Sequence, residues 1–376
     1  MTAAEAAAPG EAIDVVAEHL RKRFDAKKVS FLIVDLTGRA VARLSTATVE
    51  DEREVERIGL SDSVYGQVIR EQSPFQETTD RGQRIIAPVS NRGDAIGLLE
   101  LLLPDAPGSD VLEAVSEAAR FLAYIVIANR QFTDLYVWGR RTTRPSLAAE
   151  IQYQLLPSSL SFESEQFALS GNLEPSEDIS GDTFDYILDR DILHLSITDP
   201  MGHNLNAALT ATVLMGALRS ARRASAGLAE QARQADVALS DHGHGHATGQ
   251  LLRIHLRTGR AELVNAGHPW PLRMRDEVVT EVECEVDHPF GLALPSSRPY
   301  RVQELDLRPG DRLVILTDGM LEREAANVDL PDMVRATRHL HPREAALALT
   351  TAVLDACGGQ VEDDATVMCL DWHGTT

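Results

Sequence analysis

Cysteine is scarce in this chain of 376 residues. The three cysteines are Cys284, Cys357 and Cys369, and no two of them are close in the sequence. This spacing argues against a disulfide framework and against a zinc site built on neighbouring cysteines. The residues before Cys284 include no cysteine, which excludes an iron–sulfur cluster and a thioether-linked chromophore from that part of the chain.

Long apolar runs and positive charge are also lacking. The longest uninterrupted apolar stretch, residues 121–128, is far short of the ~20 residues that a membrane-spanning helix needs. The amino terminus has no basic region followed by an apolar one, so we expect a cytoplasmic protein. Lys and Arg number 36 against 57 Asp and Glu, a formal net charge of −21. This balance argues against nucleic-acid and membrane-surface partners, because both present negative charge.

The composition is that of a soluble globular protein, with 44% hydrophobic and 25% charged residues. Its length predicts two domains. We expect a flexible tail over residues 1–10, a sensor-sized domain over 11–130, a helical linker over 131–157 and a second domain over 158–373.

Alternating apolar segments in the first domain predict an antiparallel sheet flanked by helices, an α+β class. The segments 84–89 and 95–103 are separated by a turn-like sequence and predict a hairpin. A helix with Ile13, Val16 and Leu20 on one face precedes the sheet.

A long helical stretch follows the Pro-Gly-Ser-Asp turn at 107–110. Its apolar residues recur at alternating steps of three and four, which is typical of a coiled-coil seam. The seam either pairs with a helix of a second chain, giving a homodimer through the linker helices, or packs on the domain's own sheet. A polar helix over 138–156 would continue into the second domain. The seam residues are Leu112, Val115, Ala119, Leu122 and Val126.

Four acidic turns flank predicted strands of the second domain. Asp199 and Asp318 each end an apolar strand, while Asp182 and Asp363 each lie just before one. None of these turns contains Lys or Arg, so carboxylates gathered there would repel one another unless a cation held them together. Oxygen-only ligands suit the hard cations Mg²⁺ and Mn²⁺. Any one such turn is an ordinary turn, but four of them could converge on one sheet edge.

The motifs that carry these carboxylates, in their order, resemble the PPM/PP2C-type protein serine/threonine phosphatases, in the bacterial branch that includes RsbU and SpoIIE. The resemblance covers most of residues 147–372 and implies an αββα sandwich of two antiparallel sheets with two metal ions at one edge. The matching motifs are Ile151-Gln-Tyr-Gln-Leu-Leu-Pro157, Ser180-Gly-Asp182, Thr198-Asp-Pro-Met-Gly-His203, Asn265-Ala-Gly-His-Pro269, Leu316-Thr-Asp-Gly319 and Glu362-Asp-Asp-Ala-Thr366.

The resemblance also implies roles for individual residues. Asp199 would bridge two Mn²⁺ or Mg²⁺ ions, with the carbonyl of Pro200 as a neighbouring ligand. Asp182 would serve one ion, and Asp318 with Asp363 the other. The family pattern favours Asp363 over its neighbour Asp364, which stays an alternative. The implied reaction is direct attack of metal-activated water on phosphorus, without a phosphoenzyme.

The chain departs from the family at three positions. Pro200 follows the motif aspartate, Asn204 stands where glycine is common, and Thr183 replaces a frequent aromatic residue. Asn204 would fill a position that favours positive φ. These changes could tune activity.

The motif histidines His203 and His268 could act as general acids, but we favour a role in fixing turns. The alternating His242, His244 and His246 could bind Zn²⁺ or Ni²⁺, yet their intervening glycines favour a solvated loop.

The first domain resembles a GAF domain, with a PAS-like sensor as the alternative. It would either bind a small-molecule or protein ligand or serve only for dimerisation. By resemblance, the substrate would be a phosphorylated anti-anti-sigma (STAS-type) protein in a sigma-factor pathway. Two other functions stay open: a catalytically weakened phosphatase-like protein that binds its partner without turnover, and a hydrolase of small phosphates.

Overall fold

The computed structural model describes residues 7–44, 56–141, 146–176, 181–243, 245–292 and 298–375. The chain forms two compact units, unit 1 over residues 1–142 and unit 2 over residues 143–376. Within the described ranges, no helix is both long and apolar enough to cross a membrane. The predicted tail lies outside the described residues up to position 6.

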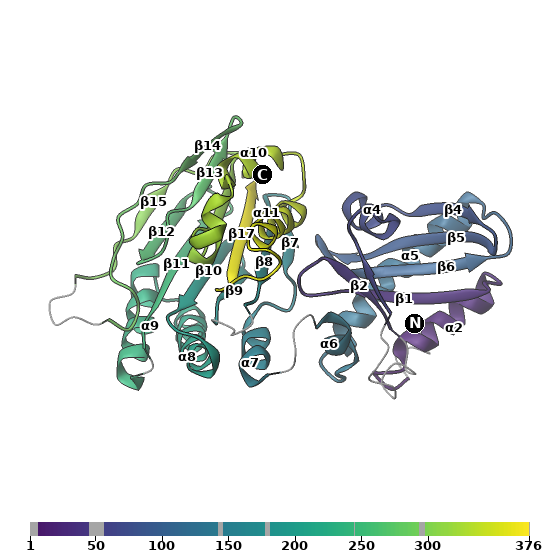
Figure 1. The fold of residues 1–376 in the computed structure, drawn as a ribbon, viewed down its shortest axis with the longest axis horizontal. Helices are drawn as coiled ribbons and strands as arrows, with labels where there is room; N and C mark the ends of the chain where they lie inside the picture. Colours follow the sequence, from purple (N-terminus) through teal and green to yellow (C-terminus); the bar gives the residue numbers. More distant parts are fainter. Residues whose placement is uncertain are drawn as a thin grey trace. The chain divides into compact units, whose positions relative to one another are not determined.

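Unit 1 is built on one antiparallel sheet of six strands in the order β3-β2-β1-β6-β5-β4 (Figure 1). The predicted hairpin is its longest pair, β5 and β6. The strands are β1 (Lys28–Val34), β2 (Ala40–Leu44), β3 (Arg57–Gly59), β4 (Phe75–Thr79), β5 (Gly82–Asn91) and β6 (Asp94–Leu103). The helices are α2 (Ala12–Arg23), α4 (Val64–Glu71), α5 (Ser109–Asn129) and α6 (Leu135–Arg140).

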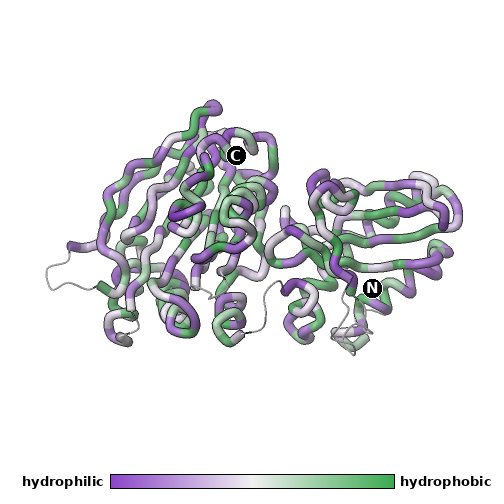
Figure 2. Tube along the Cα trace, in the orientation of Figure 1, coloured by the Kyte–Doolittle hydropathy of each residue, from purple (hydrophilic) through white to green (hydrophobic). Residues whose placement is uncertain are grey.

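Helices cover both faces of this sheet. Residues of α2 and α5 share one apolar core with the strands, and α4 forms a second core on the opposite face. Figure 2 shows the hydrophobic stretch that runs along β6, which is buried almost throughout. The predicted α+β class and helix-flanked antiparallel sheet are confirmed, while the GAF identity of the unit stays a prediction.

The predicted seam of α5 packs on the unit's own sheet. Val115, Ala119, Leu122 and Val126 are 0–1% exposed and belong to the core that α5 shares with the strands. Of the two alternatives for the seam, the structure therefore supports packing within the domain. A homodimer through the linker helices stays a prediction.

The prediction of one continuous polar helix over residues 138–156 is wrong. Helix α6 ends at Arg140, after which Arg141 is extended, and α7 (Leu147–Leu155) begins anew. Ser146 is the extended N-cap of α7, and its side chain accepts a hydrogen bond from the Ala149 amide. An N-cap starts a helix because it satisfies an amide that has no partner in the first turn.

Unit 2 contains two antiparallel sheets, of order β15-β12-β11-β10-β9 and β14-β13-β16-β17-β8-β7. The strands are β7 (Ser161–Glu163), β8 (Phe167–Glu174), β9 (Thr183–Asp189), β10 (Ile192–Pro200), β11 (Ala247–His255), β12 (Ala261–Ala266), β13 (Leu272–Arg275), β14 (Val278–Glu281), β15 (Gln303–Leu305), β16 (Arg312–Leu316) and β17 (Ala365–Trp372). The helices after α7 are α8 (Asn204–Arg223), α9 (Leu228–His242), the 3-10 turns η1 (Asp318–Met320) and η2 (Arg323–Asn327), α10 (Leu330–Ala336) and α11 (Pro342–Ala356).

The two sheets pack face to face with helices outside them (Figure 1). The central core joins apolar residues of β10 and β11 to those of β8, β16 and β17. Helices α8 and α9 cover the outer face of the five-stranded sheet, and α10 with α11 cover that of the six-stranded sheet. This is the predicted αββα sandwich. Strand β17 is a central strand of the six-stranded sheet, and β10 lies next to the edge strand β9 of the five-stranded sheet. The end of β10 and the start of β17 lie beside the carboxylates of interest.

The packing of α5 generates a test. Leu122→Ala should lower the free energy of unfolding by about 2–5 kcal/mol, because it leaves a cavity in a closed core. Phe121→Ala is the control, since Phe121 is the outward-facing neighbour. Denaturant unfolding of the full chain measures both. If the loss of stability in Leu122→Ala instead increased as the protein was diluted, Leu122 would lie at an interface between two chains.

Candidate active site at the acidic edge of the sandwich

The four predicted carboxylates come together at one edge of the sandwich. Asp182 directly precedes β9, and Asp199 is the next-to-last residue of its neighbour β10. Asp318 begins η1 just after β16, and Asp363 lies just before the neighbouring β17. Each sheet therefore contributes two carboxylates from adjacent strands.

Asp182 is bonded to the opposite sheet. Its Oδ2 accepts hydrogen bonds from Thr317 Oγ1 at 2.8 Å and from Thr366 Oγ1 at 2.6 Å. The Thr366 amide donates to Thr317 Oγ1 at 3.1 Å, which fixes the two hydroxyls relative to each other. Asp182 is only 1% exposed. One oxygen of this carboxylate is thus held in a set direction by two threonines.

Asp364 has a different role from Asp363. Its buried carboxylate accepts hydrogen bonds from the Ser176 amide at 2.8 Å, the Gly181 amide at 3.0 Å and Gln152 Nε2 at 2.5 Å. These contacts occupy it with protein donors. Asp363 is exposed, and within the described ranges its Oδ1 accepts a hydrogen bond from the Asp364 amide at 2.8 Å. Asp363 is therefore the more accessible of the two carboxylates, and its role as a ligand stays a prediction.

Burial and mutual repulsion raise the pKa of three of these carboxyl groups. Burial is the main cause for Asp182, followed by the charges of Asp199 and Asp364. Burial also raises the pKa of Asp199, with added repulsion from Asp318 and Asp363. The pKa of Asp318 rises through burial and the nearby Asp363. These shifts show that the groups are close enough to oppose one another's ionisation.

No basic side chain compensates this charge within the described ranges: Asp182, Asp199, Asp318 and Asp363 make no ion pair with Lys, Arg or His there. Asp185, three residues from Asp182, is the contrast, because it pairs with Arg219 at 3.2 Å and Arg222 at 2.9 Å. The acidic edge therefore has the electrostatics of a cation site and Asp185 those of a structural ion pair.

The donor set fits a hard divalent cation, because it consists of partly buried carboxylate oxygens without a counter-charge. The aspartate side chains do not form a complete set of ligands around one point. In the described part of the chain, no three His, Cys, Asp or Glu side chains are arranged so that they could hold one ion together.

Both motif histidines have structural surroundings. Burial lowers the pKa of His268 to about 3, which keeps its ring neutral at physiological pH. Thr248 Oγ1 lies 2.9 Å from His268 Nδ1 and 3.4 Å from Asp199 Oδ2, so His268 reaches Asp199 through a hydroxyl. His203 is exposed at the N-cap of α8. These surroundings favour the turn-fixing role over general acid catalysis.

The departures from the family pattern are accommodated by the backbone. Pro200 ends β10 opposite Ala247, and Asn204 has φ of +63°, the left-handed conformation expected at this position. The histidine tract is only partly described: α9 ends at His242, β11 begins after His246, and His244 lies outside the described residues.

Sequence reasoning missed the residues that position the carboxylates. Gln152 is fully buried and donates to both Asp364 and the Asp182 carbonyl, although it lies in the motif that precedes the sandwich. The residue types Gln, Ser and Thr carry no signal by themselves, because their role depends on contacts across the fold. Gly319 had a local signal in its Asp-Gly dipeptide: a Cβ there would lie 2.2 Å from the Asp364 carbonyl oxygen.

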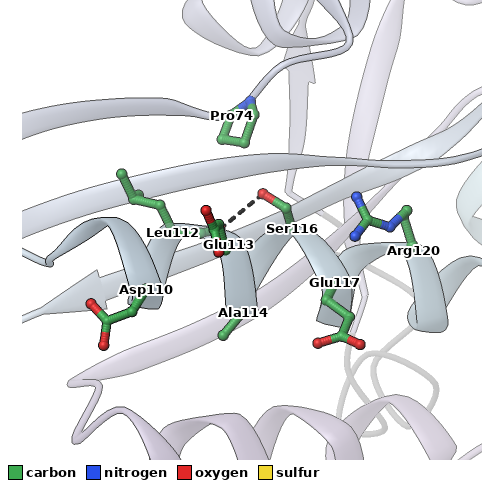
Figure 3. A pocket seen from close by; sticks show the side chains of 8 residues that line it. All are labelled: Pro74, Asp110, Leu112, Glu113, Ala114, Ser116, Glu117 and Arg120. Carbon is green, nitrogen blue, oxygen red and sulfur yellow. Dashed lines mark hydrogen bonds between the residues drawn. The ribbon is translucent and has the colours of Figure 1, made fainter.

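Two hollows in the described part of unit 1 include none of these aspartates. The larger of the two, of about 650 Å³, lies along α5, and its lining includes three acidic side chains and one arginine (Figure 3). The smaller, of about 370 Å³, surrounds Glu100, which accepts hydrogen bonds from Arg43 and Tyr65, both at 2.7 Å. The larger hollow is lined by Pro74, Asp110, Leu112, Glu113, Ala114, Ser116, Glu117 and Arg120.

An αββα sandwich with acidic turns at one edge is the architecture of a PP2C-type phosphatase. Residues 189–373 match the family model for Stage II sporulation protein E (SpoIIE). Unit 2 therefore contains a PP2C-type phosphatase domain of the SpoIIE family, a class of phosphoprotein phosphatases. In the comparison with curated proteins, no sequence matches the chain.

The chain is similar to several solved structures. The RsbU and RsbW domains of Rv1364c from Mycobacterium tuberculosis match with 24% identity and a TM-score of 0.50, over 59% of this chain and 62% of that one. The phosphatase domain of SpoIIE from Bacillus subtilis, with a fragment of its regulatory domain, matches with 21% identity and a TM-score of 0.48, over 57% and 66%. The SiaA PP2C domain of Pseudomonas aeruginosa matches with 20% identity and a TM-score of 0.47, over 54% and 84%.

Two aspartates of one segment should respond oppositely to the same substitution. In chelator-treated protein, Asp182→Asn should raise the free energy of unfolding at pH 7, because it removes repulsion at the acidic edge. Asp185→Asn should lower it by about 1–3 kcal/mol, because Arg219 and Arg222 lose a charged partner.

The pH dependence of the same measurement has a definite sign. A carboxyl group whose pKa is raised on folding stabilises the fold below its unfolded pKa, and this contribution is lost as the pH rises through the folded pKa. Metal-free wild type should therefore lose stability as the pH rises above about 4, and Asp182→Asn should lose less. Equal pH profiles would contradict the proximity of these carboxylates.

Gln152 gives a second test. Gln152→Ala should cost about 1–3 kcal/mol of unfolding free energy, because the Asp364 carboxylate loses a donor where water is excluded. Gln154→Ala is the matched control, since Gln154 lies exposed on the same helix. Denaturant unfolding of both variants decides. Equal effects would mean that α7 does not support the site.

Proposed function

We propose that the chain is a metal-dependent phosphatase that hydrolyses phosphoserine or phosphothreonine in a protein. The observation that carries the proposal is the convergence of Asp182, Asp199, Asp318 and Asp363 at one edge of the sandwich without a basic partner among the described residues. The family match of the surrounding domain supports it.

The chain's own residues would prepare the edge for two Mn²⁺ or Mg²⁺ ions. Asp199 would contact both, with the Pro200 carbonyl beside it, while Asp182 would serve one ion and Asp318 with Asp363 the other. When bound, such ions activate water and neutralise negative charge on the phosphoryl group. Thr317 and Thr366 hold one oxygen of Asp182, and its other oxygen would be the one to contact an ion.

The proposed substrate is a phosphorylated anti-anti-sigma protein of the STAS type. This rests on the resemblance of the motifs to the RsbU and SpoIIE branch and on the SpoIIE family match. Dephosphorylation would then release a sigma factor.

The proposed control comes from unit 1 as a GAF-like sensor, which would bind a small molecule or a protein. Gln152, in the predicted linker, bonds directly to Asp364 and to the Asp182 carbonyl. A shift of α7 would therefore disturb both groups. We propose that linker helices, paired in a homodimer, transmit the state of unit 1 to the acidic edge in this way.

A second function, binding of a phosphoprotein without turnover, is favoured by one observation. The described residues contain no ready-made group of three ligating side chains. Such a protein would recognise the same partner but hydrolyse it slowly or only after rearrangement.

The deciding assay is hydrolysis of p-nitrophenyl phosphate by the full chain with and without Mn²⁺. Wild type should be active only with the ion. Asp199→Ala and Asp318→Ala should each lower kcat/KM by roughly 100-fold or more, the range seen when one charge-stabilising group is removed from an active site. Asp355→Ala, an exposed aspartate on α11, is the control.

Turnover that does not need metal, or variants as active as wild type, would refute the two-metal proposal. Wild type that binds Mn²⁺ but does not turn over would support the binding protein instead. Strong turnover of small phosphates and none of phosphoproteins would indicate a metabolite hydrolase.

A further inference from the structure

Beside the acidic edge lies an exposed surface without charge, formed by the turn after β10, the start of α8 and one residue of a neighbouring loop. We propose that this surface, the uncharged face, docks the folded phosphoprotein substrate through apolar contacts. The inference rests on the proposed phosphatase function and specifies how a protein substrate is held. The uncharged face comprises Met201, Leu205, Leu209 and Leu292.

The sequence around this face stands out from the rest of the chain. From Pro200 to Leu218 there is no charged residue, although a quarter of the whole chain is charged. Much of this stretch is the buried side of α8, for which apolar residues are expected. Residues 201–206, however, are all exposed in succession, so the absence of charge extends to solvent-facing positions.

The face is apolar where a solvated helix end would normally be polar. Leu205 and Leu209 lie one turn apart on α8 and are 39% and 38% exposed, and Met201 is 53% exposed. Leu292, from the loop beyond β14, is 39% exposed. Single exposed apolar residues are common, but several gathered beside a site indicate an interaction surface.

Met201 and residues next to Leu209 and Leu292 lie against one turn. The Met201 amide donates to the His246 carbonyl at 3.0 Å. Gly291, next to Leu292, packs against the same turn: a Cβ on it would lie 2.6 Å from the Gly245 carbonyl oxygen. A Cβ on Gly245 would lie 3.9 Å from Thr210 Oγ1, the residue after Leu209. The face therefore surrounds the turn at 245–246 rather than following one helix.

The face adjoins the candidate site on two sides. Met201 is two residues from Asp199, whose strand it leaves. The first turns of α8 pack on the other carboxylate segment, where a Cβ on Gly181 would lie 3.1 Å from the Ala207 Cβ. A phosphorylated side chain is short, so the surface of a protein that presents one to this edge would lie close to the uncharged face.

The chemistry of the face selects the class of partner. The chain carries a net charge of −21 and a phosphoprotein carries negative charge at its phosphoryl group, so an uncharged apolar contact holds the partner without adding repulsion. The fitting partner is a folded protein with an apolar patch next to its phosphorylated Ser or Thr. A free phosphate ester or a short peptide has too little apolar surface to use the face.

The test compares substrates of different size in the full chain. The probes are a phosphorylated STAS-domain protein, a ten-residue phosphoserine peptide with its sequence around the modified residue, and p-nitrophenyl phosphate. The variants are Leu205→Gln and Leu209→Gln, singly and combined. Leu340→Gln is the matched control, because Leu340 is equally exposed, at 39%, beside α10 and α11 in the opposite outer layer.

We expect the double variant to lower kcat/KM for the phosphorylated STAS protein roughly 10-fold or more, the scale of one well-buried leucine contact. Turnover of the peptide and of p-nitrophenyl phosphate should not change, because contacts remote from phosphorus act only on substrates that reach them. Leu340→Gln should resemble wild type with all three probes.

Unchanged turnover of the phosphoprotein by the double variant would overturn the proposal, as would an equal loss with all three probes. A change in oligomeric state with unchanged phosphoprotein turnover would also overturn it and assign the face to a second copy of the chain. If wild type hydrolyses none of the probes, the proposed function fails. Equilibrium binding of the phosphorylated STAS protein then tests the docking face separately. Weaker binding by the double variant supports the face, and unchanged binding overturns it.

Discussion

The buried carboxylate of Asp364 is the interaction on which the geometry of the candidate site depends. Donors reach it from the loop after β8, from the turn before β9 and from α7, so three separate segments are fixed by one side chain. A buried carboxylate is stable only when such donors surround it. This arrangement fixes the positions of the neighbouring Asp363 and Asp182. Asp364 therefore builds the edge, whereas Asp363 and Asp182 present negative charge at it.

Two buried aspartates near this edge have opposite electrostatic surroundings. At Asp185 the fold supplies arginines, and the resulting ion pair joins β9 to α8. At Asp182, three residues earlier, it supplies only threonine hydroxyls, which orient the carboxylate without neutralising it. Asp182 and Asp185 are thus distinguished by their partners rather than by their burial, since both are buried.

The main features of unit 2 could be predicted because they are local in sequence. Asp199 and Asp318 end apolar strands, and strand ends of one sandwich meet at one edge; the left-handed Asn204 also follows from its motif. The fold of unit 1 was predictable from alternation for the same reason. Two features were not. The seam of α5 has the spacing of a coiled coil whether it meets a second helix or its own sheet, and only the packing of Leu122 distinguishes the two. Gln152 could not be assigned because its partner lies at the far end of the domain.

That separation bears on how the protein is made. The bond between Gln152 and Asp364 joins the first helix of unit 2 to the turn before its last strand, and β8 likewise pairs with β17. Contacts between residues so distant in sequence form late, after most of the chain has been synthesised. A ribosome-bound chain that has not yet emerged as far as Asp363 lacks that carboxylate and also β17, a central strand of the six-stranded sheet. The acidic edge is therefore complete only when the last strand of the domain has been made.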